Sequence, residues 1–258
     1  MISVFDIFKI SIGPSSSHTV GPMKAGKHFV DTLQEKGLLQ KVNRLVVDVY
    51  GSLSLTGKGH HTDIAIILGL SGYLPDTVDI DAIPGIIRDV NTMHRLFIEE
   101  GQREIQFPVA ECMRFHNEFL PLHENGMSIT AFCDGKIAHF QTYYSIGGGF
   151  IVTEENFGKN QDAEVDIPFP FYSARNLLAH CHDNCLSISA VMMKNEIARH
   201  GRESVEQNMA KIWETMRNAI NRGMNTEGIL PGPLKVPRRA SALHRVLAPQ
   251  SQSITPLS

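Results

Sequence analysis

The spacing of apolar residues changes twice along this chain of 258 residues, and this limits the folds that it can adopt. Up to about residue 93 the apolar residues recur mostly at helical spacing, interrupted by the β-branched run RLVVDVYG at 44–51, which predicts a buried strand. Between about 95 and 153, apolar and polar residues alternate in short runs, with Asn125-Gly126 and Asp134-Gly135 at expected turns. From about 174 the helical spacing returns and persists to about 223.

This order of patterns predicts an α+β fold with an antiparallel sheet section. We expect an N-terminal domain like an α/β sandwich at 1–157, and the polar, then proline-rich stretch that follows it predicts a linker at 158–173. An all-helical segment is expected at 174–247. The last residues, 248–258, show no periodicity and predict a disordered tail.

Composition excludes several classes of protein. Apolar residues make up 42% and charged residues 20%, the net charge is −3, and there is no basic block, so we expect no nucleic-acid partner. No run approaches the roughly 18 apolar residues of a membrane helix, and the N-terminus does not resemble a signal peptide. The four cysteines do not form the pattern of a secreted disulfide framework, which makes a cytoplasmic location the expectation.

The stretch GPSSSHTVGP at 13–22 is the first candidate site. It places Ser15, Ser16, Ser17 and His18 just before a helical pattern. The start of a helix leaves backbone N–H groups unpaired, so this loop can hold a carboxylate or phosphate, and the imidazole can act as acid, base or donor. The alternative is that one serine caps the helix and the others are solvated.

The stretch GSLSLTGKGHHTD at 51–63 is the second candidate. We expect a loop that leaves the carboxyl end of a strand, where open sheets commonly bind ligands. His60, His61 and Asp63 come together there, and a carboxylate near a histidine can orient it and make it more basic. The alternative is a turn with solvated histidines.

The third candidate, YYSIGGGF at 143–150, offers the Ser145 hydroxyl and the unhindered amides of Gly147 and Gly148. A bulge or hinge is the alternative. HENGM at 123–127 is interpreted mainly as a hairpin turn, and HCHDNC at 180–185 as ordinary helical cysteines, because a zinc site would need further ligands.

Four stretches together resemble the bacterial iron–sulfur L-serine dehydratases, and the similarity extends from Met1 to about Leu247. These stretches are GPSSSHTVGPMKAGK, YGSLSLTGKGHHTDIAI, TYYSIGGGF and NTEGILPGPLKVPRRASAL. The resemblance implies a β domain similar to the allosteric substrate-binding domain of some phosphoglycerate dehydrogenases, joined to a helical catalytic α domain. That α domain carries a [4Fe-4S] cluster on three cysteines, and its unligated iron acts as a Lewis acid on the hydroxyl of L-serine. No pyridoxal phosphate is implied.

The resemblance also implies roles for residues of this chain. His18 and His60 fall on the catalytic histidines that face the cluster, and the motif match leaves open which of them is the base. Ser15, Ser16 and Ser17 would hold the substrate carboxylate. Ser145 and the glycines after it would lie nearby, and we include His61 and Asp63 among the expected substrate-binding residues.

The chain departs from that family in its cysteines. The cluster ligands of the family follow the matched region, and no cysteine of this chain corresponds to one, so we expect no metal ligand here. We therefore expect a truncated or frame-shifted α domain and no activity of the isolated chain. The alternatives are a module that binds serine or another small carboxylate, alone or with a separate α chain, and a decayed product with exposed apolar helix faces. The expected protein partner is an α domain or a second copy of this chain.

Overall fold

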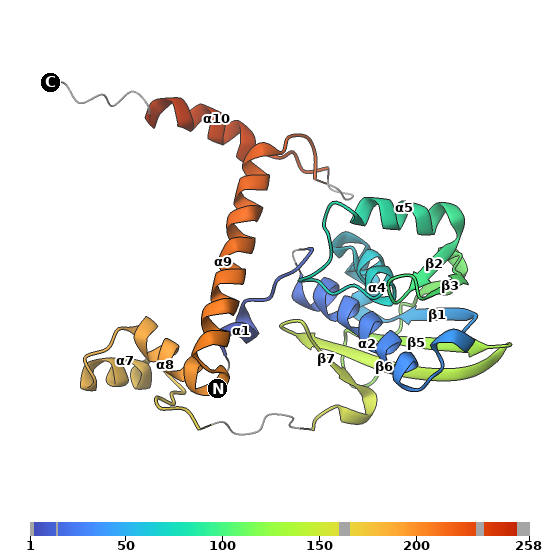
Figure 1. The fold of residues 1–258 in the computed structure, drawn as a ribbon, viewed down its shortest axis with the longest axis horizontal. Coiled ribbons are helices and arrows are strands. Elements are labelled where there is room, and N and C mark those ends of the chain that lie inside the picture. Colours follow the sequence, from blue (N-terminus) through green and yellow to red (C-terminus); the bar gives the residue numbers. More distant parts are fainter. Residues whose placement is uncertain (1–2, 14, 160–165, 231–234, 252–258) are drawn as a thin grey trace. The chain divides into compact units, whose positions relative to one another are not determined.

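A computed structural model describes residues 3–13, 15–159, 166–230 and 235–251. The chain divides into two compact units (Figure 1). The first unit, at 9–162, contains a sheet covered by helices, and we call it the α/β unit. The second, which we call the helical unit, combines 1–8 with 163–258. A mixed α/β section followed by helices confirms the predicted α+β class.

The α/β unit is built on a five-stranded sheet in the order β4-β1-β5-β6-β7. β4 is parallel to β1 and the other neighbours are antiparallel, so the prediction of a wholly antiparallel section is wrong at this edge. β2 and β3 form a separate antiparallel pair. The strands are β1 (Arg44–Val49), β2 (Arg95–Ile98), β3 (Arg103–Gln106), β4 (Met113–Phe115), β5 (Gly126–Cys133), β6 (Lys136–Gly147) and β7 (Phe150–Thr153).

Two helices, α2 (Gly21–Glu35) and α4 (Thr62–Leu70), pack against each other beside the sheet, as Figure 1 shows. Gly26 and Gly69 let their backbones approach: a Cβ on Gly69 would lie 2.0 Å from the carbonyl oxygen of Met23. Apolar side chains of α2 and α4 pack with those of alternate strand positions to form one buried core. The core therefore fixes the two helix starts, at residues 21 and 62, side by side.

The stretch at 51–60, which we predicted as a loop, is helical. It forms α3 (Gly51–Gly57) and then the 3₁₀ turn η3 (Lys58–His60). Gly51 begins α3 with a φ of 54°, and a Cβ there would lie 2.3 Å from the carbonyl oxygen of Glu124. Because glycine has no Cβ and tolerates a positive φ, Gly51 lets the chain leave β1 and turn directly into a helix. Leu53 then anchors α3 in the core.

The two expected turns differ in outcome. Asp134 and Gly135, with φ values of 50° and 79°, form the hairpin turn between β5 and β6, as predicted. Asn125 and Gly126 do not form a hairpin turn, since Gly126 is the first residue of β5. The remaining elements of this unit are the π-helix η1 (Ser16–Val20), η2 (Leu39–Lys41), α5 (Ile83–Met93), α6 (Val109–Cys112) and η4 (Glu154–Asn156).

The helical unit has a small core in which Val191 and Val205 are fully buried. Its N-terminal helix is held by Glu196, whose fully buried carboxylate accepts the Ser3 hydroxyl at 2.6 Å and the Val4 amide at 2.9 Å. Its helices are α1 (Val4–Ile7), α7 (Ala174–Asp183), α8 (Ile188–His200), α9 (Arg202–Asn225) and α10 (Ala240–Ser251).

Helix α10 continues to Ser251, so it enters the region at 248–258 that we predicted as a tail; the rest of that region lies outside the described residues. Each residue added to a helix that has already formed gains one hydrogen bond in return for its lost conformational freedom, and this explains the extension. The predicted linker overlaps 160–165, which also lie outside the described residues.

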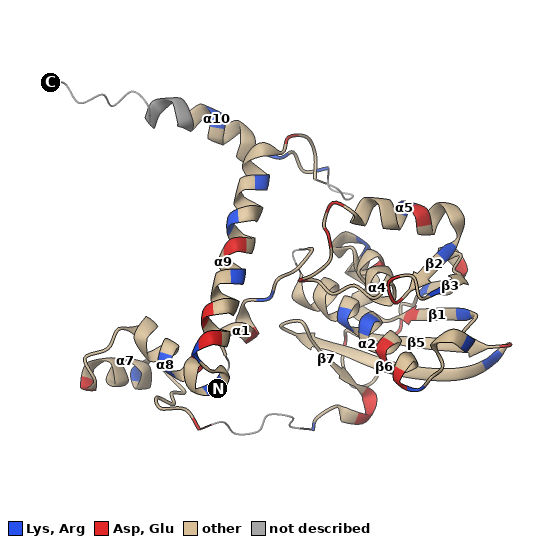
Figure 2. Ribbon diagram, in the orientation of Figure 1, with Lys and Arg blue, Asp and Glu red and all other residues tan. Residues whose placement is uncertain are grey.

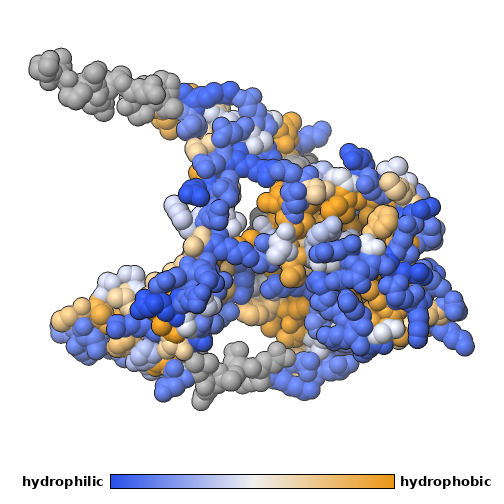
Figure 3. Space-filling view, viewed as in Figure 1, coloured by the Kyte–Doolittle hydropathy of each residue, from blue (hydrophilic) through white to orange (hydrophobic). Residues whose placement is uncertain are grey.

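Large apolar side chains remain exposed on the helical unit, including Trp213, Met216 and Ile220 of α9 and Leu243 and Leu247 of α10. Figure 3 shows apolar residues at the surface of α7 and α8 as well. Acidic and basic residues are interspersed along α9 (Figure 2). Across the described part of the chain, every helix is too short or too polar to cross a membrane.

Candidate active site

The serine-rich stretch forms the first turn of a continuous helix, because η1 runs directly into α2. Ser15 is the N-cap, and its Oγ accepts the backbone N–H of His18 at 3.1 Å. Ser15 therefore has the capping role that the alternative interpretation gave to one serine, whereas Ser16 is exposed. The helix start presents His18 on its first turn.

Both ring nitrogens of His18 have hydroxyl partners. Nδ1 lies 2.9 Å from Ser17 Oγ, and Nε2 lies 3.1 Å from Ser52 Oγ on α3. Burial, and next the charge that His60 can carry, lower the pKa of His18, while a hydrogen bond with Ser52 and the carboxylate of Glu124 act in the opposite direction. The imidazole of His18 is therefore held neutral at pH 7 between two hydroxyls.

His60 lies beside His18, with their ring centroids 5.0 Å apart and tilted by 42°. Nδ1 of His60 lies 3.0 Å from the carbonyl oxygen of Thr56. A carbonyl only accepts, so Nδ1 must carry the proton, and Nε2 of the neutral ring has a free lone pair. His60 is thus oriented as a proton acceptor.

Two threonines connect the segments that carry these histidines. Thr19 Oγ1 donates to the carbonyl oxygen of His60 at 2.9 Å, and Thr62 Oγ1 donates to that of His18 at 2.6 Å. Both threonines are buried. The reciprocal hydrogen bonds join the start of α2 to the start of α4, so the imidazoles keep their spacing.

Ser145 and the glycines after it support the same helix start from the sheet. Ser145 is buried, and its Oγ donates to the carbonyl oxygen of Ser17 at 2.7 Å. A Cβ on Gly21 would lie 2.1 Å from Ser145 Oγ, so glycine is required for this approach. Gly147 and Gly148, with φ values of 97° and 59°, make the turn from β6 into β7. The structure therefore places Ser145 as a support for Ser17.

His61 and Asp63 lie at the start of α4. His61 has a φ of 57°, which is the left-handed conformation and directs the chain from η3 into α4. Asp63 Oδ1 accepts the backbone N–H of Ile64 at 2.9 Å. Among the hydrogen bonds of the described residues, none joins Asp63 to a histidine, so the expected carboxylate–histidine pair is not formed.

Sequence reasoning did not find several residues that the structure brings to this site. Ser52 contacts His18, and Thr56 fixes the tautomer of His60. The segment at 123–125 also borders the site, because the carbonyl oxygen of Glu124 accepts the Ser52 amide at 2.9 Å and Asn125 binds Ser145. The Asn-Gly pair within HENGM indicated a turn, and this hid the second role of the segment.

The described residues contain no group of three or more His, Cys, Asp or Glu side chains that could hold a metal ion. The four cysteines are unpaired; Cys112 and Cys133 belong to the α/β unit, and Cys181 and Cys185 to the helical unit. The described part of the chain therefore does not fit the iron–sulfur cluster that the resemblance implies.

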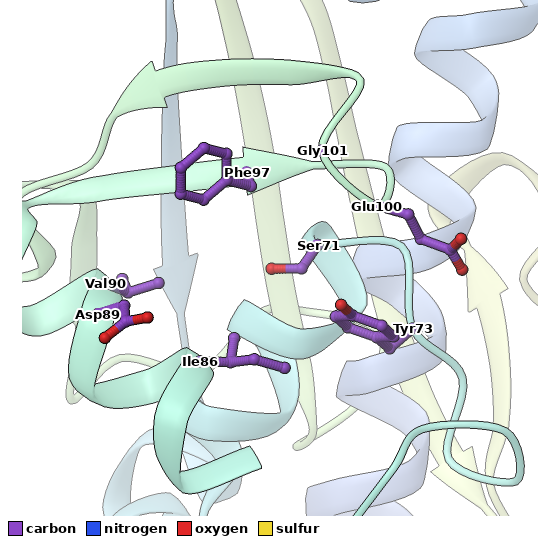
Figure 4. Close-up of a pocket in the computed structure, with 8 residues that line it drawn as sticks. All are labelled: Ser71, Tyr73, Ile86, Asp89, Val90, Phe97, Glu100 and Gly101. Carbon is purple, nitrogen blue, oxygen red and sulfur yellow. The ribbon is translucent and has the colours of Figure 1, made fainter. Parts of the chain in front are cut away.

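A separate pocket of the α/β unit lies between α5 and β2 (Figure 4). The rings of Tyr73 and Phe97 and the carboxylates of Asp89 and Glu100 border it. None of the predicted site residues lines this pocket. It is thus distinct from the histidine site.

Comparisons with known proteins agree with these two regions. The family model described as serine dehydratase beta chain matches 3–156, and the model described as serine dehydratase alpha chain matches 183–255. L-serine dehydratase 2 of Escherichia coli (strain K12) is 63% identical over 255 residues, which cover 99% of this chain and 56% of that protein. L-serine dehydratase 1 of the same strain is 62% identical over 247 residues, which cover 96% of this chain and 54% of that protein.

A third relative, L-serine dehydratase of Haemophilus influenzae (strain ATCC 51907 / DSM 11121 / KW20 / Rd), is 54% identical over 248 residues, or 96% of this chain and 54% of that protein. The chain spans about half the length of the curated relatives that it matches. The beta-chain model alone covers more than half of the 258 residues. With the histidine pair and the helix start now described, this match shows that the chain belongs to the serine dehydratase family.

Proposed function

We propose that this chain forms the substrate-binding and proton-accepting wall of an L-serine ammonia-lyase site, which converts L-serine to pyruvate and ammonia. The observation that carries the proposal is that the rings of His18 and His60, with centroids 5.0 Å apart, lie beside a serine-rich helix start. The names of the relatives identify L-serine as the substrate to test.

The helix start is suited to the substrate carboxylate. The hydroxyls of Ser16 and Ser17 and the first backbone N–H groups of the helix are donors, and the helix dipole adds partial positive charge. Ser15 contributes through its capping bond, which fixes the direction of these amides. Ser145 contributes by holding Ser17.

His60 is the stronger candidate for the base. Its Nδ1 is committed to Thr56, so Nε2 can accept the α proton of the substrate. His18, whose two nitrogens already have hydroxyl partners, is placed to orient Ser17 and Ser52 and to share the transferred proton. His61 and Asp63 shape the segment that carries His60.

The overall reaction requires the loss of the α proton and of the β hydroxyl as hydroxide. The aminoacrylate that forms tautomerises to an imine, and water then releases ammonia and leaves pyruvate. In the family that this chain resembles, a [4Fe-4S] cluster would supply the Lewis acid that helps the hydroxide to leave. The described residues do not fit that group. We also propose a cytoplasmic location, because all four cysteines are unpaired thiols.

A second candidate function is a serine-binding module that pairs with a separate α chain. The exposed apolar residues of α9 and α10 favour it, since a partner helix could cover them. Both functions require the same serine site and differ in whether this site takes part in the lyase reaction or only binds serine.

Isothermal titration calorimetry of the 258-residue chain with L-serine tests the shared site. We expect saturable binding of L-serine, and much weaker binding after H18A/S17A substitution. A flat titration with the wild-type chain would contradict both functions. Pyruvate release in the presence of a complementing α chain separates the two functions: the enzyme should release pyruvate from L-serine there and none as the isolated chain, whereas the module should bind L-serine and release none in either case.

A further inference from the structure

The pocket between α5 and β2 lies outside the proposed serine site and has a volume of about 240 Å³ (Figure 4). It is smaller than the roughly 300–1,000 Å³ of pockets for drug-sized ligands, so its size suits a small molecule. The rings of Tyr73 and Phe97 line it together with two aliphatic side chains of α5, those of Ile86 and Val90. These walls can cover the apolar chain of a ligand.

The side chains that add polarity to the pocket are hydrogen-bond acceptors. Ser71 is buried, with 4% of its surface exposed, and its hydroxyl donates to the carbonyl oxygen of Ile67 at 2.9 Å. Because the proton of this hydroxyl is committed, only the lone pairs of Oγ remain for a ligand. The carboxylates of Asp89 and Glu100, on opposite sides of the pocket in Figure 4, also only accept. A ligand that fits this pocket must therefore bring donors.

The charge at the border of the pocket is negative. Glu99, the residue before Glu100, is paired with Lys27 at 3.1 Å, whereas among the described residues no ion pair involves Glu100. The cation nearest to Asp89 is Arg88 at 3.7 Å, and because their side chains are 50% and 74% exposed this pair is weak. A cationic ligand is therefore favoured, and the carboxylate of an amino acid would be repelled.

The end of α4 adds to this negative potential and fixes one wall of the pocket. Ser71 is the C-cap of α4, and its carbonyl oxygen accepts the Glu100 amide at 2.7 Å. A Cβ on Gly72 would lie 2.9 Å from the backbone nitrogen of Glu100, so glycine allows the helix end to contact the turn between β2 and β3. The C-terminal end of a helix carries partial negative charge, which favours a cation beside it.

We propose that this pocket binds a small alkylguanidinium cation. The guanidinium group brings five N–H donors and no acceptor, which matches the acceptors of Ser71, Asp89 and Glu100. It is planar and weakly hydrated, and it stacks on aromatic faces such as those of Tyr73 and Phe97. The alkyl chain lies against the aliphatic side chains of α5. This site is separate from the serine site and does not depend on the proposed lyase function.

NMR titration of the 258-residue chain with n-butylguanidinium tests the proposal. The comparison compound is n-butylurea, which has nearly the same shape and no charge. We expect n-butylguanidinium to shift backbone amide signals of 71–73, 86–90 and 97–101, and n-butylurea to bind about tenfold more weakly. Equal binding of the two compounds, no binding of n-butylguanidinium, or shifts confined to other segments would each overturn the inference.

Two variants test the assigned groups. D89N/E100Q removes both charges and keeps the shape of the side chains, and we expect it to weaken n-butylguanidinium binding by about fivefold and n-butylurea binding by less than about twofold. F97L keeps an apolar side chain without the ring and should weaken n-butylguanidinium binding by about threefold. E35Q, at an exposed glutamate of α2, is the control and should bind as wild type does. Unchanged binding in D89N/E100Q would contradict the inference.

Circular dichroism establishes whether each variant folds, and if one does not, the two compounds still decide on the wild-type chain. Binding of n-butylguanidinium should also weaken when sodium chloride is raised from about 0.01 M to about 0.1 M, because salt screens the exposed carboxylates. Affinity that does not change with salt would overturn the inference. Failure of the proposed function has a different signature, since L-serine would then not bind while n-butylguanidinium still does.

Discussion

The two imidazoles differ in what their neighbours permit. The carbonyl oxygen of Thr56 fixes the tautomer of His60, because it can only accept a hydrogen bond from Nδ1. His18 lies between two hydroxyls, each of which can donate or accept. A base needs a free lone pair, and an orienting group needs partners. The division of roles between the histidines therefore follows from backbone and hydroxyl positions.

The depressed pKa of His18 predicts how stability depends on pH. Burial, and next the charge of His60, lower this pKa below 6.5, the value of the model compound. Below 6.5 the unfolded chain binds a proton at His18 that the folded chain resists, so stability is full above that pH and falls as the pH drops toward the folded pKa. We expect H18Q to lose less of its free energy of unfolding than wild type between pH 7.5 and 5.5.

Urea unfolding at the two pH values measures this difference. H182Q, at an exposed histidine of α7, is the control and should show the pH dependence of wild type. An unchanged pH dependence in H18Q would contradict the assigned burial of the His18 ring.

The approach of Gly21 to Ser145 predicts a coupled pair of substitutions. G21A places a Cβ 2.1 Å from Ser145 Oγ and should destabilise the chain by about 1–3 kcal/mol. S145G removes that hydroxyl and its Cβ, so the double variant should recover part of the loss. G59A, which meets nothing within 4 Å, is the control for adding a methyl group. Additive effects of G21A and S145G in thermal unfolding would show that the two residues are not in contact.

At the scale of elements, the site depends on the close packing of α2 and α4. His18 lies one turn before α2 and His60 lies just before α4, so the distance between these helices sets the distance between the rings. Gly26 and Gly69 allow this short distance, because a Cβ on either glycine would collide with backbone atoms of the other helix.

Substitution of Gly69 should therefore affect both stability and binding. G69A gains helix propensity but meets the Met23 carbonyl oxygen, and we expect a net loss of about 2 kcal/mol together with weaker L-serine binding. G223A in α9 meets nothing within 4 Å and should stabilise the helical unit by about 0.5–1 kcal/mol. Unfolding and calorimetry of both variants check this, and equal effects at the two positions would contradict the packing argument.

The elements with strong local signals could be predicted from the sequence. The β-branched run predicted β1, and Asp134-Gly135 predicted the turn between β5 and β6. Helix α3 could not be predicted in this way, because its glycines and serines favour a loop until Leu53 is buried in the core. Asn125 was missed for a related reason, since its local signal is a turn and its partners are distant in sequence.

The histidine pair shows the same limit. The residue types in each segment indicate acid–base chemistry, but nothing in either segment indicates the other. Their proximity depends on Thr19 and Thr62, which bond across 41 and 44 residues of sequence. The family resemblance supplied the pairing that residue patterns alone could not.

At the scale of the whole molecule, the two units differ in how much core supports them. The main apolar core belongs to the α/β unit, whereas the helical unit buries few apolar side chains and exposes many. We expect two unfolding transitions in calorimetry, with the helical unit unfolding first.

Glu196 provides a selective test of this expectation. E196A leaves the Ser3 hydroxyl and the Val4 amide without their acceptor. It should lower the free energy of unfolding of the helical unit by about 1–3 kcal/mol and so shift only the first transition. E203A, at an exposed residue of α9, is the control. Hydrogen exchange should show faster exchange in α8 and α9 and no change in β5 and β6. A single transition that shifts as a whole would contradict the independence of the two units.

The measurement that tests the central claim most directly is ¹⁵N-detected NMR of the histidine rings during titration with L-serine. We predict that neutral His60 shows a protonated Nδ1, and that the signals of His18 and His60 shift together at the same ligand concentration while those of His182 stay fixed. If L-serine shifts the signals of neither ring, or of only one of the two, His18 and His60 do not share a substrate site.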